Sequence, residues 1–111
     1  MALPHAHPDD IVDLLPTPSA EPTPVSVSLL RTANLQLLRL VLPAGHHMPE
    51  HRVPGELTIQ CLHGRALIGT PQGPRELAAG QLVALAGDEP HDVRAPEAAV
   101  LLLTLLHPTA P

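Results

Sequence analysis

Proline and glycine break this chain into short pieces, and their spacing limits the fold more than any other feature of the sequence. There are 15 prolines and 7 glycines in 111 residues. Proline lacks the amide hydrogen that helices and interior strands need, and glycine favours turns. The pieces between them are apolar and lack the periodicity of a substantial helix. We therefore expect an all-β fold of short strands joined by turns.

The predicted strands begin at residue 25. They are residues 25–30, 35–42, 56–62, 65–69, 75–77, 81–85, 91–94 and 99–106. Many short strands separated by regular turns indicate a sandwich or a barrel. The length allows one domain with one core. Because the chain has no Phe, Tyr or Trp, that core has to consist of aliphatic side chains.

Composition also argues against nucleic acid as a partner. Without aromatic residues there is no platform on which bases could stack. The six basic residues are all arginines, and the formal net charge of −5 does not favour a surface that binds duplexes. We therefore expect no nucleic-acid partner.

Three features bear on where the protein is found. The first residues lack the cationic and apolar regions of a signal peptide. The single cysteine, Cys61, cannot form an internal disulfide. The apolar run at residues 98–106 is too short to span a bilayer. We expect a cytoplasmic protein without a membrane partner.

The first 24 residues differ from the rest because they are rich in proline and acidic side chains. We treat residues 1–24 as a separate segment, 25–107 as the β-barrel and 108–111 as a tail. One apolar island, residues 11–15, should form a short edge strand on the barrel or on a neighbouring subunit. The island would be followed by an extended connector.

Two predicted strands are apolar on both faces, residues 37–42 and 100–106. A strand with one wet face should alternate between apolar and polar side chains. The outer face of these strands should therefore be covered, either by the amino-terminal segment or by another subunit. We expect a homodimer.

Glycines and histidines recur at intervals typical of a two-part motif. The first part runs from Gly45 through His51 to Gly64, and the second from Gly80 to His91. Together they resemble the two motifs of the cupin family. That resemblance implies a cupin-type double-stranded β-helix, which is a jelly-roll barrel. It also implies that His51 and His91 converge on one site inside the barrel.

Several positions depart from the cupin pattern. The second histidine of the first motif is replaced by Val53 and the glutamate by Leu57. In the second motif the Pro, Gly and Asn positions hold Ala86, Asp88 and Ala95. The matched positions thus supply only two of the three or four donors that a divalent transition metal takes in proteins.

Three side chains are candidates for a third donor. His47 shares a face with His51 if the strand alternates regularly, and could reach the site if the chain bends at Met48. Glu56 could turn inward if there is a bulge at Gly55. Cys61 points inward but should lie deep in the barrel. We predict a metal site of His51, His91 and His47, with Glu56 as the main alternative for the third ligand.

The same alternation predicts an aliphatic pocket beside the two histidines. It would be lined by Val53, Leu57, Ile59 and Val93. Such a pocket suits a small, partly apolar molecule. We expect a protein that binds a small molecule and that could also hold a divalent metal such as Zn, Ni, Mn or Fe. The alternative is a metal-dependent enzyme, of the dioxygenase or isomerase type that the resemblance allows. The sequence assigns no catalytic residue.

Overall fold

The computed structural model describes residues 5–16 and 24–107, and within these ranges it contains nine β-strands and no helix. The strands are β1 (Val25–Arg31), β2 (Leu35–Leu42), β3 (His47–His51), β4 (Leu57–His63), β5 (Arg65–Thr70), β6 (Gly73–Ala78), β7 (Leu82–Leu85), β8 (His91–Arg94) and β9 (Ala99–Leu106). The predicted all-β class is confirmed. None of the described segments forms a helix long and apolar enough to cross a membrane.

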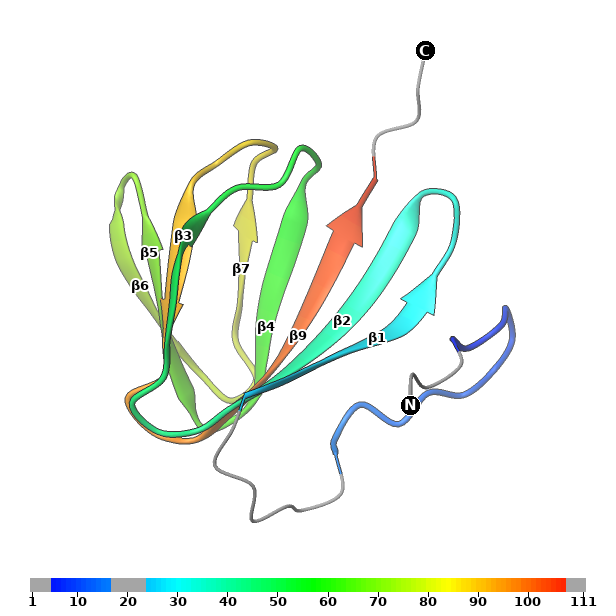
Figure 1. Ribbon diagram of the computed structural model, residues 1–111, viewed down its shortest axis with the longest axis horizontal. Coiled ribbons are helices and arrows are strands. Elements are labelled where there is room, and N and C mark those ends of the chain that lie inside the picture. Colours follow the sequence, from blue (N-terminus) through cyan, green and yellow to red (C-terminus); the bar gives the residue numbers. More distant parts are fainter. Residues whose placement is uncertain (1–4, 17–23, 108–111) are drawn as a thin grey trace.

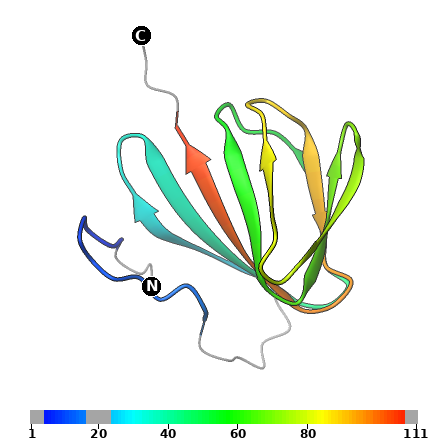
Figure 2. The same cartoon turned by 180° about the vertical axis from the view of Figure 1, so that it is seen from behind.

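The strands form two antiparallel sheets that face each other (Figure 1). Sheet A has the order β1-β2-β9-β4-β7, and sheet B has the order β3-β8-β5-β6. Each sheet therefore mixes strands from both halves of the chain, as in a jelly roll. The sheets lie close together at one end and spread apart at the other, as Figures 1 and 2 show from opposite sides.

All the predicted strands are present, with bounds shifted by at most two residues at either end. The sequence prediction missed only β3, whose five residues include Pro49 and three charged or polar neighbours. This strand lies at the edge of sheet B, where it pairs only with β8. An edge strand tolerates proline because one side of its backbone needs no hydrogen-bonding partner.

The core lies between the sheets and is aliphatic, as the composition requires. Along β4, Leu57, Ile59 and Cys61 are buried while the residues between them are only half-buried. This alternation places one face of each strand inside. The largest fully buried side chains include Leu42, Ile59, Ile68 and Leu101.

The amino-terminal arm, residues 5–16, differs from its predicted structure. The island at 11–15 forms no strand on the barrel, and its pairing with a neighbouring subunit stays a prediction. The arm is tied to β1 by one backbone hydrogen bond, from the Ala6 amide to the Leu29 carbonyl at 3.0 Å. Two of its apolar side chains remain in solvent, with Ile11 97% and Leu15 61% exposed. The predicted connector at 17–23 and tail at 108–111 lie outside the described residues.

Candidate functional site

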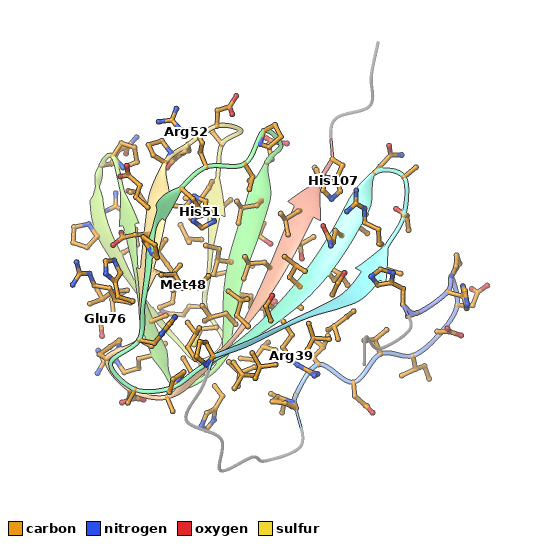
Figure 3. All side chains as sticks on the ribbon, viewed as in Figure 1. Arg39, Met48, His51, Arg52, Glu76 and His107 are labelled. Atoms are coloured by element: carbon orange, nitrogen blue, oxygen red, sulfur yellow. The ribbon has the colours of Figure 1, made fainter. Side chains whose placement is uncertain are left out.

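Two histidines meet between the sheets. His51 ends β3 and His91 begins β8, where the two residues are paired across the strands. Their ring centroids are 4.4 Å apart, with the ring planes inclined by 58°. His91 is only 2% exposed, whereas His51 is open to solvent. Figure 3 shows His51 on β3 near the end where the sheets spread apart, so the pair links the core to the solvent.

A bulge in β3 explains why His51 points inward. His47 pairs with Arg94 and Met48 with Val93, but the next pair joins His51 to His91. Two residues of β3 therefore oppose one residue of β8, and the extra residue reverses the alternation of faces. His47 and His51 consequently point to opposite sides of the sheet. The prediction that they share a face is wrong because it assumed a regular strand.

His47 lies on the outer face of sheet B, where it contacts Asp92. Its Nε2 is 2.8 Å from Asp92 Oδ2, and Arg94 Nε lies 3.6 Å from the same oxygen. The hydrogen bond from His47 lowers the pKa of Asp92, and the charges of His47 and Arg94 act in the same direction against the effect of burial. His47 is thus engaged by a carboxylate outside the barrel, and the structure does not bring it to the histidine pair.

Glu56 and Cys61, the other two candidates for a third metal ligand, also lie away from the histidine pair. Glu56 is exposed in a groove of about 530 Å³, which it lines together with Asn34, Leu106 and His107. Cys61 is fully buried, and its Sγ contacts the carbonyl oxygens of His63 and Gly64, each at 3.4 Å. Burial raises the pKa of this thiol, which keeps it protonated. Along β4, Cys61 is about 13 Å from Leu57, the position of the cupin glutamate.

The donor set does not fit a metal held by three or more protein ligands. Across residues 5–16 and 24–107, no three His, Cys, Asp or Glu side chains gather closely enough to hold an ion. The two positions that should complete the cupin set carry hydrocarbon: Leu57 is 3% exposed and Val53 packs against the core. Binding of a metal by His51 and His91 stays a prediction.

Both imidazoles are fixed by the backbone through Nδ1. His51 Nδ1 lies 3.3 Å from the Pro49 carbonyl oxygen, and His91 Nδ1 lies 3.0 Å from that of Glu89. A carbonyl oxygen only accepts, so each Nδ1 carries the hydrogen and donates it. In the neutral ring Nε2 is then an acceptor with a free lone pair. The site therefore presents two imidazole acceptors side by side.

The predicted pocket residues face the interior. Leu57, Ile59 and Val93 are buried in the core cluster, and Val53 packs on it from the loop after β3. The Asp88 amide donates to the Val53 carbonyl at 2.7 Å, which ties the loops after β3 and β7 together. Sequence reasoning missed Met48, which also packs on the core, because the bulge was not recognised.

Backbone conformation supports the alignment of both motifs. Gly64 has a φ of 76°, and a Cβ there would collide with the Ala98 carbonyl oxygen. Asp88 stands where the cupin pattern has glycine, and its φ is 61°. Aspartate is one of the few residues other than glycine that adopt this left-handed conformation. The turn is therefore kept although its glycine is not.

Comparisons with known proteins identify the architecture. No family model matches the sequence, and no curated protein matches it significantly. Among solved structures, a conserved Streptococcus pyogenes protein of unknown function has a TM-score of 0.79 and 24% identity, with 99% of this chain and 97% of that chain covered.

Two further solved structures are similar to this chain, a cupin superfamily protein and a lyase. A cupin superfamily protein from Desulfitobacterium hafniense has a TM-score of 0.75 and 16% identity, covering 89% of this chain and 100% of that one. The DMSP lyase DddQ from Ruegeria pomeroyi has a TM-score of 0.72 and 22% identity, covering 79% of this chain and 49% of that one. Identities this low establish the fold and not the activity. The chain therefore has the fold of the cupins, in the form of a small jelly-roll barrel.

Proposed function

We propose that this protein binds a small aliphatic molecule whose O–H or N–H groups donate hydrogen bonds to His51 and His91. The observation that carries this proposal is the pair of imidazoles 4.4 Å apart, each with its Nδ1 bonded to a backbone carbonyl. Two neighbouring Nε2 acceptors, at a site that His51 opens to solvent, suit a ligand that brings hydrogen-bond donors.

The surroundings limit the rest of the ligand to hydrocarbon. Val93 is buried on the same face of β8 as His91, Leu57 and Ile59 are buried on the inner face of β4, and Val53 packs on the core from the loop after β3. The chain has no Phe, Tyr or Trp that could stack on a ring. Specificity would come from a few polar groups in an apolar site, as in most small-molecule sites. Short aliphatic alcohols and amides have this combination of groups.

A metal-dependent enzyme is less well supported. That hypothesis needs a third protein ligand, and its predicted third ligand, His47, is hydrogen-bonded to Asp92 on the outer face. The DMSP lyase shares the fold at 22% identity, which transfers no activity to this chain. We derive no chemical step through a metal.

Thermal-shift measurements with matched compounds test the proposal. The probes are short aliphatic alcohols and primary amides, each compared with its O-methylated or N,N-dimethylated counterpart, which cannot donate. We expect the donors to raise the melting temperature of the native protein but not of His51→Ala or His91→Ala. His47→Ala is the matched control, since it removes an imidazole from the same strand on the opposite face.

The metal content of protein purified without an affinity tag, measured by elemental analysis, tests the alternative of a metal-dependent enzyme. Near-stoichiometric metal that is lost in both His51→Ala and His91→Ala would overturn the proposal in favour of the enzyme. Equal stabilisation by donors and by their methylated counterparts would also contradict it, because the histidines would then contribute nothing to recognition.

A further inference from the structure

We propose that the groove at the end of β9 binds the ammonium group of a primary aliphatic amine. This groove has a volume of about 530 Å³, which lies in the range of small-molecule sites. Three polar side chains line it, Asn34, Glu56 and His107, together with Leu106 and the backbone of two loops. Figure 3 shows His107 at the end where the sheets spread apart. The histidine pair is not among the described residues of the lining, so this inference goes beyond the proposed function.

Backbone hydrogen bonds fix the walls of the groove. The Leu106 amide donates to the Glu56 carbonyl at 3.0 Å, and the His107 amide donates to the Asn34 carbonyl at 2.8 Å. The end of β9 therefore holds both the turn after β1 and the loop after β3. At Gly87 a Cβ would collide with the carbonyl oxygen of Pro54, so these two loops are also in close contact. Because the fold fixes the walls, a ligand would lose little free energy in ordering them.

The His107 ring contributes a hydrogen-bond acceptor. Its Nε2 lies 3.0 Å from Gln36 Oε1, and Arg31 Nη1 donates to the same oxygen at 3.3 Å. The Gln36 amide nitrogen donates to Ser28 Oγ at 3.0 Å, which fixes the orientation of the amide. An amide oxygen only accepts, so His107 Nε2 carries the hydrogen. In the neutral ring Nδ1 is then an acceptor, and the ring suits a ligand that donates.

The charges around the groove favour a cation. Glu56 is exposed, and it is the one carboxylate or guanidinium side chain among the described residues of the lining. The two loops that border the groove, residues 52–56 and 86–90, carry three carboxylates and one guanidinium. An excess of negative charge attracts cations and repels anions. Arg31, which shares the Gln36 oxygen with His107, is exposed, so water screens its repulsion of a cation.

Among cations, an alkylammonium ion fits the lining best. Its three N–H groups can donate to the Glu56 carboxylate, the His107 ring and the Asn34 amide oxygen. Its alkyl chain can pack on Leu106, whose side chain is 47% exposed. A transition-metal ion is less suitable because it takes three or four protein donors. No three His, Cys, Asp or Glu side chains gather closely enough for that in the part of the chain that the structure describes.

A nuclear magnetic resonance titration of the isotopically labelled full chain with n-butylammonium at low ionic strength tests the inference. We expect saturable shifts of the Glu56, Leu106 and His107 amide signals, with a dissociation constant in the millimolar range. Tetramethylammonium has the charge but no N–H donor, and n-butanol has the chain but no charge, so both should bind more weakly. Glu56→Gln should raise the dissociation constant for n-butylammonium at least about threefold.

Two variants serve as controls. Glu97→Gln removes the same charge beside the start of β9, about 23 Å along the strand from the groove, and should leave binding unchanged. His51→Ala should also leave it unchanged, which separates the groove from the histidine pair. The absence of saturable binding would overturn the inference, and so would equal weakening by Glu56→Gln and Glu97→Gln. Binding that is lost in His51→Ala but kept in Glu56→Gln would overturn it as well, because the amine would then bind at the histidine pair.

Discussion

The two faces of the β3–β8 pair give the same type of side chain opposite environments. On the inner face, His51 and His91 stand side by side among aliphatic residues. On the outer face, four residues earlier in β3, His47 is hydrogen-bonded to Asp92 beside Arg94. The extra residue in the β3 bulge turns His51 to the inner face while His47 stays on the outer face. The lesson is that strand register, and not residue type, decides which histidine could serve a site.

The largest effect expected from this difference is on stability. Ile68 and Leu67 are neighbours on β5, which also pairs with β8, but Ile68 is fully buried and Leu67 is only half-buried on the outer face. Ile68→Ala should reduce the free energy of unfolding by about 2–5 kcal/mol, because it removes methyl groups and leaves a cavity. Leu67→Ala should cost less than about 1.5 kcal/mol. Urea unfolding measures both, and equal costs would show that the faces are assigned wrongly.

A second, smaller effect concerns metal affinity. Restoring donors on the inner face by Val53→His with Leu57→Glu should complete a set of four with the two native histidines. We expect affinity for Zn²⁺ to rise at least about tenfold over the native protein, measured by competition with a chelating dye.

The control for that change uses the opposite face of the same strand. Thr58 follows Leu57 and pairs on the outer side of sheet A. Val53→His with Thr58→Glu adds the same groups but points the carboxylate away from the histidines. If both double variants bind Zn²⁺ equally, the alignment of the first motif is wrong.

Much of the fold could be predicted because it depends on local chemistry. Proline and glycine mark the turns, and alternating aliphatic residues mark strands such as β4 and β5. The turns and strands require only that each segment behaves in the ordinary way. The convergence of His51 and His91 was implied by the resemblance of the two motifs to those of the cupins, and in the structure it depends on the bulge in β3.

The position of His47 could not be predicted because it depends on the bulge. Nothing in the residues His47 to His51 marks a bulge except Pro49, which equally indicates a loop. The structure of the arm was not predicted either. β1 is an edge strand with one side free, yet residues 11–15 form no strand on it, and the backbone hydrogen bond from the arm to β1 comes from Ala6.

The smallest effect is the pH dependence that the outer-face pair produces. The hydrogen bond from His47 lowers the pKa of Asp92 below its ordinary value of 3.8 in the folded protein. The ionised carboxylate therefore stabilises the fold above pH 3.8, and this contribution is lost as the pH falls through the lowered value. His47 is 43% exposed and Asp92 24%, so solvent screening limits the contribution to about 0.2–1 kcal/mol.

His47→Ala should remove this pH dependence and leave the inner site intact. The unfolding free energies of the native protein and the variant should differ well above pH 3.8 and converge below it. Gly69→Ala should also disrupt the hydrogen bond between His47 and Asp92, because a Cβ at Gly69 would collide with Asp92 Oδ1 and turn the carboxylate away. Ligand-induced stabilisation should survive both changes. Its loss in His47→Ala would mean that the two faces are coupled, and that the bulge does not separate them energetically.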